Sequence, residues 1–334
     1  MNARLSPTRT RRSTLALGVL AALLVLIPAA PAAAADVDVI VTFSEQAGQN
    51  PEGLAIDTSG NTFVSMSALG QLWKLPAGST TPEVFGSVSG IVPGQDFGLL
   101  GLATDAPGNV YGAVQAANPD TNGVWRFDGS TGEATRLAGS EAIQVANGLA
   151  FGRRGTLYVT DSLLGAIWRI PPGGAASVWL QHPLLTGDGS LGLFIGANGI
   201  AFRHGVLYVT NTERRTLLAV PVRPNGTAGR PRDRTSFAPG FSPDGIALDV
   251  LGNAYVAINL QNTITRVAQD GTQTVVTAGD PLDFPSSVAF GNTKGNRRNL
   301  FAVNFSIGEL FGVPGGFGPA LLRIGVGVPG IPLP

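Results

Sequence analysis

The stretch Ala146–Phe151 (ANGLAF), followed by Gly155–Asp161 (GTLYVTD), decides the fold of this chain. A short run of small apolar residues leads through a turn into a run in which apolar and polar residues alternate. The pattern recurs, and the equivalent positions in the six copies are residues 52, 100, 147, 198, 244 and 286. Copies spaced roughly 40 to 50 residues apart indicate a repeat architecture.

Each copy is expected to contain four short strands. In the third copy we place them at residues 148–152, 156–161, 166–171 and 177–180. The second of these alternates as a half-buried strand does, and the glycine and alanine of the first suit a strand crowded against its symmetry mates. Four strands repeated six times predict an all-β fold, a six-bladed β-propeller. A seven-bladed ring and a β-sandwich are the rival folds.

The two ends of the sequence favour a closed ring. The sixth copy offers strands at residues 287–290, 300–304 and 320–326, but no fourth strand follows. The segment Val37–Phe43 is strand-like and has no partner of its own. We therefore expect this N-terminal segment to complete the last blade, which would leave no open sheet edge.

Residues 1–35 are expected to be a secretory signal peptide, and the propeller domain is assigned to residues 36–334. Four arginines precede an apolar run at residues 15–27, which is too short to span a bilayer, and Ala33-x-Ala35 offers a cleavage site. The pair Arg11-Arg12 leaves twin-arginine export open, although Thr14 stands where that signal prefers a large apolar residue. The mature protein is thus predicted to be secreted, to a periplasm or the extracellular space.

The composition limits the partners and the chemistry. Without residues 1–35 the chain has 18 basic and 22 acidic residues, a mildly acidic balance that argues against nucleic acid or an anionic membrane as a partner. The absence of cysteine excludes disulfides and thiol chemistry. No later stretch is apolar for long enough to cross a membrane. We expect a monomer that acts on a small molecule.

One repeat position carries side-chain oxygens. First strands of a propeller begin at one face beside the central channel, so the residues at this position should converge on the axis. Two carboxylates and two amides there would form an oxygen-only ligand set, which suits Ca²⁺ best and also Mg²⁺ or Mn²⁺. Asn-Gly and Asp-Gly are also common turn pairs, but four such residues in one position favour a metal site. We call the six residues at this position the ring residues: Glu52, Leu100, Asn147, Asn198, Asp244 and Ser286.

These residues resemble those of the family of senescence marker protein, gluconolactonase and luciferin-regenerating enzyme, with diisopropylfluorophosphatase and the paraoxonases as more distant relatives. The family consists of six-bladed propellers with a divalent ion in the channel. Its ligands are a Glu before Gly in the first blade, Asn in the third and fourth, and an Asp before Gly in the fifth. The matching residues here are Glu52, Asn147, Asn198 and Asp244.

The resemblance implies a divalent-metal-dependent hydrolase of a lactone or a related ester. It makes Asp244 the general base or the nucleophile, and Asn147 and Asn198 the holders of metal and substrate oxygens. Val145 replaces an arginine that sugar-lactone members often have two residues before the third-blade Asn. The loops expected to face the site are also apolar, which favours an apolar lactone or ester over a sugar; the residues concerned are Ile91, Phe97, Leu191, Leu193, Phe194 and Ile195.

Other functions stay open. The alternative is a non-enzymatic exported propeller that binds a small ligand or a protein and whose ion is structural. A smaller possibility is a condensing enzyme like strictosidine synthase, which would need an acidic residue over the pocket in the last blade, where Glu309 is the candidate. The polar residues that end second strands could line the pocket, although turn roles are favoured for them: Asp161, Asn211, Asn259 and Asn304.

Overall fold

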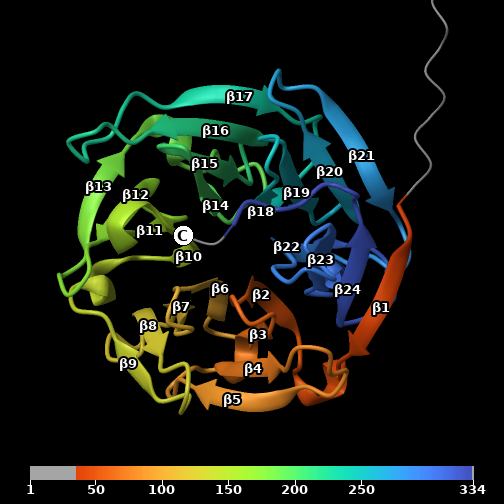
Figure 1. Ribbon diagram of the computed structural model, residues 1–334. Coiled ribbons are helices and arrows are strands. Elements are labelled where there is room, and N and C mark those ends of the chain that lie inside the picture. Colours follow the sequence, from red (N-terminus) through yellow and green to blue (C-terminus); the bar gives the residue numbers. More distant parts are fainter. Residues whose placement is uncertain (1–34, 333–334) are drawn as a thin grey trace, which may run out of the picture. The chain divides into compact units, whose positions relative to one another are not determined.

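The computed structural model describes residues 35–332, which form six four-stranded antiparallel sheets arranged as a β-propeller (Figure 1). The expected signal peptide lies outside the described residues, apart from Ala35. Helical structure in residues 35–332 is limited to short 3₁₀ segments, none of them long and apolar enough to traverse a bilayer. The prediction of six blades is confirmed, and the seven-bladed and sandwich alternatives are wrong.

The blades follow one another along the chain. Blade 1 holds β2 (Pro51–Ile56), β3 (Thr62–Met66), β4 (Gln71–Leu75) and β5 (Glu83–Ser87). Blade 2 holds β6 (Gly98–Thr104), β7 (Val110–Gln115), β8 (Gly123–Phe127) and β9 (Ala134–Arg136). Blade 3 holds β10 (Ala146–Phe151), β11 (Leu157–Asp161), β12 (Ala166–Ile170) and β13 (Ser177–Gln181).

The second half of the ring repeats this order. Blade 4 holds β14 (Ala197–Arg203), β15 (Val206–Asn211), β16 (Thr216–Pro221) and β17 (Arg232–Ser236). Blade 5 holds β18 (Pro243–Leu248), β19 (Ala254–Ile258), β20 (Thr263–Val267) and β21 (Gln273–Ala278). Blade 6 holds β22 (Pro285–Phe290), β23 (Asn299–Asn304) and β24 (Ala320–Gly325), with β1 (Val37–Thr42) as its outer strand.

The ring closes as expected, because β1 pairs antiparallel with β24 (Figure 1). Val37 lies opposite Ile324 and Thr42 opposite Ala320. Val41 is buried in a cluster that also contains Leu54 of blade 1 and Leu321 of blade 6. The N-terminal strand is therefore bound to blade 6 by backbone hydrogen bonds and packs against blade 1 through the core.

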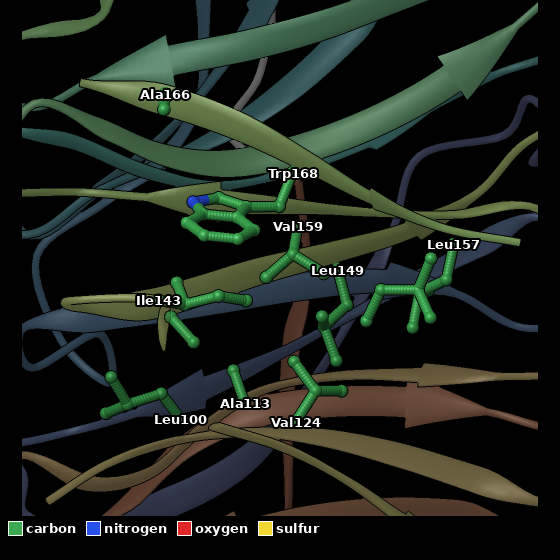
Figure 2. Packing of buried hydrophobic residues seen from close by; sticks show 11 residues of the cluster. Leu100, Ala113, Val124, Ile143, Leu149, Leu157, Val159, Ala166 and Trp168 are labelled. Carbon is green, nitrogen blue, oxygen red and sulfur yellow. The ribbon is translucent and has the colours of Figure 1, made fainter. Parts of the chain in front are cut away.

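The core lies between blades and not in one central mass. Figure 2 shows the cluster between blades 2 and 3, where Leu100 and Val124 of one blade pack against Val159 and Trp168 of the next. Five further clusters of buried apolar residues pack the ring, most of them across blade boundaries. Each fully buried side chain of this size contributes roughly 1.5–3 kcal/mol relative to exposure, so adjacent blades hold each other in place.

Every first strand carries a β-bulge at its ring residue. In blade 3, Leu149 pairs with Val159 and Ala146 with Asp161, so Asn147 and Gly148 share a single partner position. A bulge bends the strand and re-aims a side chain; here it turns the ring residue toward the channel. The same shift separates Pro51 from Leu54, Leu99 from Leu102, Ala197 from Ile200, Pro243 from Ile246 and Pro285 from Ser287.

The last described residues lie at the far end of the channel. Ile331 donates its backbone N–H to Leu248 O at 3.1 Å, and Val250 donates to Pro329 O at 3.0 Å. Ile331 and Pro332 line a cavity of about 180 Å³ together with residues from the ends of all six first strands. The tail thus crosses from blade 6 to blade 5 beneath the channel.

Candidate metal centre in the channel

The two carboxylate and two amide ring residues meet around one cavity. Glu52, Asn147, Asn198 and Asp244 all line a pocket of about 110 Å³ at the channel mouth. The same four border the next cavity along the axis, of about 70 Å³. Each of the four is at most 8 % exposed. Side chains separated by up to 192 positions in the sequence are therefore neighbours here, as the repeat predicted.

The glycine that follows five of the six ring residues determines how close the first strands come. A Cβ atom built on Gly148 would lie 2.4 Å from the carbonyl oxygen of Asn198, and one built on Gly199 would lie 2.4 Å from that of Asp244. Real Cβ atoms do not approach backbone oxygen so closely, so only glycine fits. The ring residues of neighbouring blades are brought together by this contact.

Second-strand hydroxyls connect neighbouring blades at the same level, a feature that the sequence reading missed. Thr160 Oγ1 accepts from the backbone N–H of Gly148 at 2.8 Å and donates to Asn198 O at 2.6 Å. Thr210 donates to Asp244 O in the same way, at 2.6 Å. The signal is the threonine next to the last residue of the second strand, which faces the bulge.

The two asparagine amides are held in one orientation. Asn147 donates its Nδ2 to Ser162 Oγ at 3.2 Å, and Asn198 donates its Nδ2 to Thr212 Oγ1 at 2.9 Å. Ser162 gives its own proton to Ala197 O at 2.7 Å, and Thr212 gives its proton to Pro243 O at 2.9 Å. A hydroxyl has one proton, so each must accept from its amide. This leaves both amide oxygens without a donor among the described residues.

The two carboxylates are buried together, and few hydrogen bonds offset the cost of removing their charges from water. Glu52 Oε2 is buried and has no hydrogen-bond partner in the described part of the chain. Asp244 Oδ2 accepts from Asn259 Nδ2 at 2.8 Å. Burial raises the pKa of both side chains, and the charge of Asp244 raises the pKa of Glu52 further.

This donor set fits a divalent cation. A buried carboxylate with an unpartnered oxygen is costly unless a cation offsets its charge, and none of the pocket-lining residues is Lys, Arg or His. The set is oxygen-only and mixed in charge, as Ca²⁺, Mg²⁺ and Mn²⁺ prefer. Residues 35–332 contain no group of three or more His, Cys, Asp or Glu that could hold a metal, so the amides must share in any coordination.

The loop residues expected to face the site do so in part. Phe97, Leu191, Leu193 and Ile195 line the pocket. Phe194 does not and is 58 % exposed, while its backbone N–H donates to Glu213 Oε1 at 2.8 Å. Ile91 also lies elsewhere: it packs against Gly70 and the core between blades 1 and 2. The sequence reading missed the apolar residues that blade 6 contributes, Phe284, Phe305, Ile307 and Phe311.

Of the polar residues that end second strands, Asn259 alone lines the pocket. The other three hold loops: Asp161 accepts from Val145 N, Asn211 donates to Thr186 O, and Asn304 donates to Pro281 O. Glu309 is exposed and is not among the pocket-lining residues. The condensing-enzyme alternative therefore loses its acidic candidate.

Comparisons with known proteins agree with this architecture. Residues 191–301 match the family model described as SMP-30/Gluconolactonase/LRE-like region. A search of curated proteins gave no match. Among solved structures, a luciferin-regenerating enzyme has a TM-score of 0.67 at 16% identity, over 90% of this chain and 98% of that one.

Two further solved structures are similar. A calcium-binding regucalcin from Agrobacterium tumefaciens has a TM-score of 0.63 at 17% identity, over 86% of this chain and 93% of its own. A gluconolactonase from Xanthomonas campestris has a TM-score of 0.61 at 20% identity, over 92% and 99%. At these identities the likeness shows the fold alone. Residues 191–301, which include the ring residues Asn198 and Asp244, thus form an SMP-30/gluconolactonase/LRE-like region within a six-bladed β-propeller.

Proposed function

We propose that this chain is an exported, divalent-cation-dependent hydrolase of lactones or related esters. The observation that carries the proposal is the meeting of two buried carboxylates and two oriented amides at one cavity. The family match over residues 191–301 supports the reaction class, because it names gluconolactonase among the family's members. The N-terminal pattern of residues 1–35 supports export, and N-terminal sequencing of secreted protein beginning at Asp36 would test it.

Glu52, Asn147, Asn198 and Asp244 would hold the cation. When bound, a divalent cation polarises the substrate carbonyl and stabilises the negative charge that develops on its oxygen. The orientation of the amides by Ser162 and Thr212 keeps their oxygens toward the channel before any ligand arrives. Pre-set donors of this kind need no rearrangement during the reaction.

Asp244 is the residue placed to move a proton. Its Oδ2 accepts from Asn259, and its carboxylate lines the pocket, where it would accept a proton from an attacking water. Water oxygen then bonds to the carbonyl carbon, the carbon–oxygen bond of the ring or ester breaks, and the leaving alkoxide takes the proton to give a hydroxy acid, or an acid and an alcohol. Direct attack by Asp244 as a nucleophile is the other route.

The test is a panel of lactones and aryl esters assayed with calcium and with chelator. We expect turnover that chelator abolishes, and a fall of at least about 100-fold in kcat for Asp244→Asn, the effect of losing a general base. Calcium binding measured by calorimetry on the same variant separates loss of the base from loss of the ion. Asp233→Asn, on the exposed outer strand β17, is the matched control and should change neither.

Two outcomes would contradict the proposal. Full turnover by Asp244→Asn would remove the role assigned to this residue. A calcium-dependent rise in Tm with no substrate hydrolysed would instead favour the non-enzymatic binding propeller.

A further inference from the structure

The polar side chains of the pocket have few hydrogen bonds left for a substrate. Thr212 donates to Pro243 O, and Ser242 Oγ accepts from Leu260 N at 3.0 Å. Asn259 donates both to Asp244 Oδ2 at 2.8 Å and to Pro285 O at 3.1 Å. No Lys, Arg, His, Tyr or Trp is among the lining residues. The pocket therefore offers few donors to a substrate hydroxyl or carboxylate beyond the proposed ion, chiefly the O–H of Ser242 and the second N–H of the two ring asparagines.

Blade 6 supplies an aromatic wall to the same pocket, which we define as Phe284, Phe305 and Phe311. The rings of Phe284 and Phe311 are stacked, with centroids 5.5 Å apart and planes 11° apart. Phe305 lies 6.5 Å from Phe284, tilted by 57°. These residues come from separate places in the chain, just before β22, directly after β23 and in the 3₁₀ segment Gly308–Phe311.

The aromatic wall is held in place by its backbone. Phe284 N donates to Asn262 Oδ1 at 2.7 Å, and Phe305 N donates to Phe284 O at 3.1 Å. Asp283 Oδ2 accepts from Gly318 N at 2.9 Å and so fixes the end of the connection that carries Phe311. A wall fixed in this way can bind an apolar group without first being ordered.

Resting on the proposed function, we infer that the aromatic wall determines specificity and that the site selects neutral lactones or esters with an aliphatic or aromatic substituent. The reacting carbonyl lies at the polar floor and the substituent lies against Phe284 and Phe311. A polyhydroxylated lactone would give up hydration of its hydroxyls and find few hydrogen-bond partners in return. An anionic substrate would meet the two carboxylates and no cationic side chain.

A series of six-membered lactones tests the inference. The probes are δ-valerolactone, δ-decanolactone, δ-dodecanolactone and glucono-δ-lactone, which share the reacting ring. We expect kcat/KM to rise by up to about fourfold for each methylene that becomes buried, and glucono-δ-lactone to be at least about 100-fold poorer than δ-decanolactone. Equal rates along the alkyl series, or preference for the sugar lactone, would overturn the inference while leaving the proposed hydrolase intact.

Phe311→Ala and Phe317→Ala form the matched pair of variants. Both phenylalanines lie on the connection between β23 and β24 and are part-exposed, at 37% and 43%, but only Phe311 lines the pocket. Phe311→Ala should flatten the dependence on chain length with little change for δ-valerolactone, and Phe317→Ala should match the parent protein. An unchanged chain-length dependence in Phe311→Ala would overturn the role of the wall.

Binding of 3-alkylcyclohexanones, measured by calorimetry with and without calcium, separates this inference from the proposed function. These ketones keep the ring and the substituent but cannot be hydrolysed. If no lactone is turned over yet affinity rises with alkyl length and falls in Phe311→Ala, the proposed function fails and the inference stands. If affinity is independent of alkyl length, the inference fails.

Discussion

Gly148 lies where the carbonyl oxygen of Asn198 in the next blade leaves no space for a side chain. The residue serves two purposes at once, since it follows the bulge that turns Asn147 toward the channel and permits the close approach of blade 4. The spacing of blades 3 and 4 and the direction of the Asn147 side chain therefore both depend on the absence of a Cβ atom at this position. The glycines after Glu52, Asn198 and Asp244 act alike, namely Gly53, Gly199 and Gly245.

Gly148→Ala should lower the free energy of unfolding by about 1–3 kcal/mol, the usual cost of overpacking. The backbone oxygen that the new Cβ meets cannot swing away as a flexible side chain would. Chemical denaturation measures the change. Gly295→Ala is the control, because Gly295 has open space around its Cβ position and an ordinary φ; its effect should stay within about 0.5 kcal/mol. Equal stability of the two variants would show that the strands are not closely packed at the ring.

Among the elements, the connection between β13 and β14 forms part of the roof of the site. Glu213, which is fully buried, accepts from Gly189 N at 2.6 Å through Oε2 and from Phe194 N at 2.8 Å through Oε1. Leu193 N donates to the same carboxylate at 3.2 Å. One side chain thus fixes the loop that places Leu191 and Ile195 over the pocket.

Glu213→Gln should loosen this loop, because glutamine keeps one acceptor oxygen and turns an N–H₂ toward amides that also donate. A buried donor left without a partner costs about 1–3 kcal/mol. We expect faster hydrogen exchange at Gly189 or at Leu193 and Phe194, and a higher KM for apolar substrates. Asp188→Asn, on the exposed part of the same loop, is the control and should leave exchange unchanged. Unaltered protection in Glu213→Gln would exclude the carboxylate as the anchor.

The sequence predicts regular elements better than connections, for a physical reason. Periodicity located β10 to β13 within two residues, because alternation and small residues reflect burial that is repeated in every blade. The bulge was missed although glycine inside a strand suggested it, since register depends on the partner strand. The aromatic wall was missed because Phe284 and Phe311 meet only through tertiary structure. The hydrogen bond between Asn198 and Thr212 was missed for the same reason, because it links a first strand to the end of a second strand.

At the scale of the whole molecule, the stability of the ring depends on the strand β1 that closes it. Val41 and Val39 belong to the closing strand β1, yet Val41 is 9% exposed and Val39 is 39% exposed. Val41→Asp would place a charge in the cluster between blades 6 and 1. We expect a loss of about 3 kcal/mol or more, which for a protein of this size lowers Tm by about 6 °C or more. Hydrogen exchange should also rise in β24, the partner of β1.

Val39→Asp on the same strand is the matched control and should change Tm little. The exposed ion pair between Arg323 and Asp38, at 2.8 Å, also bridges β24 and β1, but pairs of this kind contribute about 1 kcal/mol at most. If both valine variants lowered Tm equally, closure would depend on the strand's backbone alone.

Ile331 and Pro332 lie across the ends of all six first strands, on the face opposite the pocket. A tail in this position obstructs passage along the axis, so for the proposed hydrolysis the lactone would enter and the hydroxy acid would leave at the pocket mouth, past the aromatic wall. Entry and exit at the same mouth favour competitive inhibition by the product. This arrangement also means that a bulky apolar acid, once formed, would linger longer than a small one.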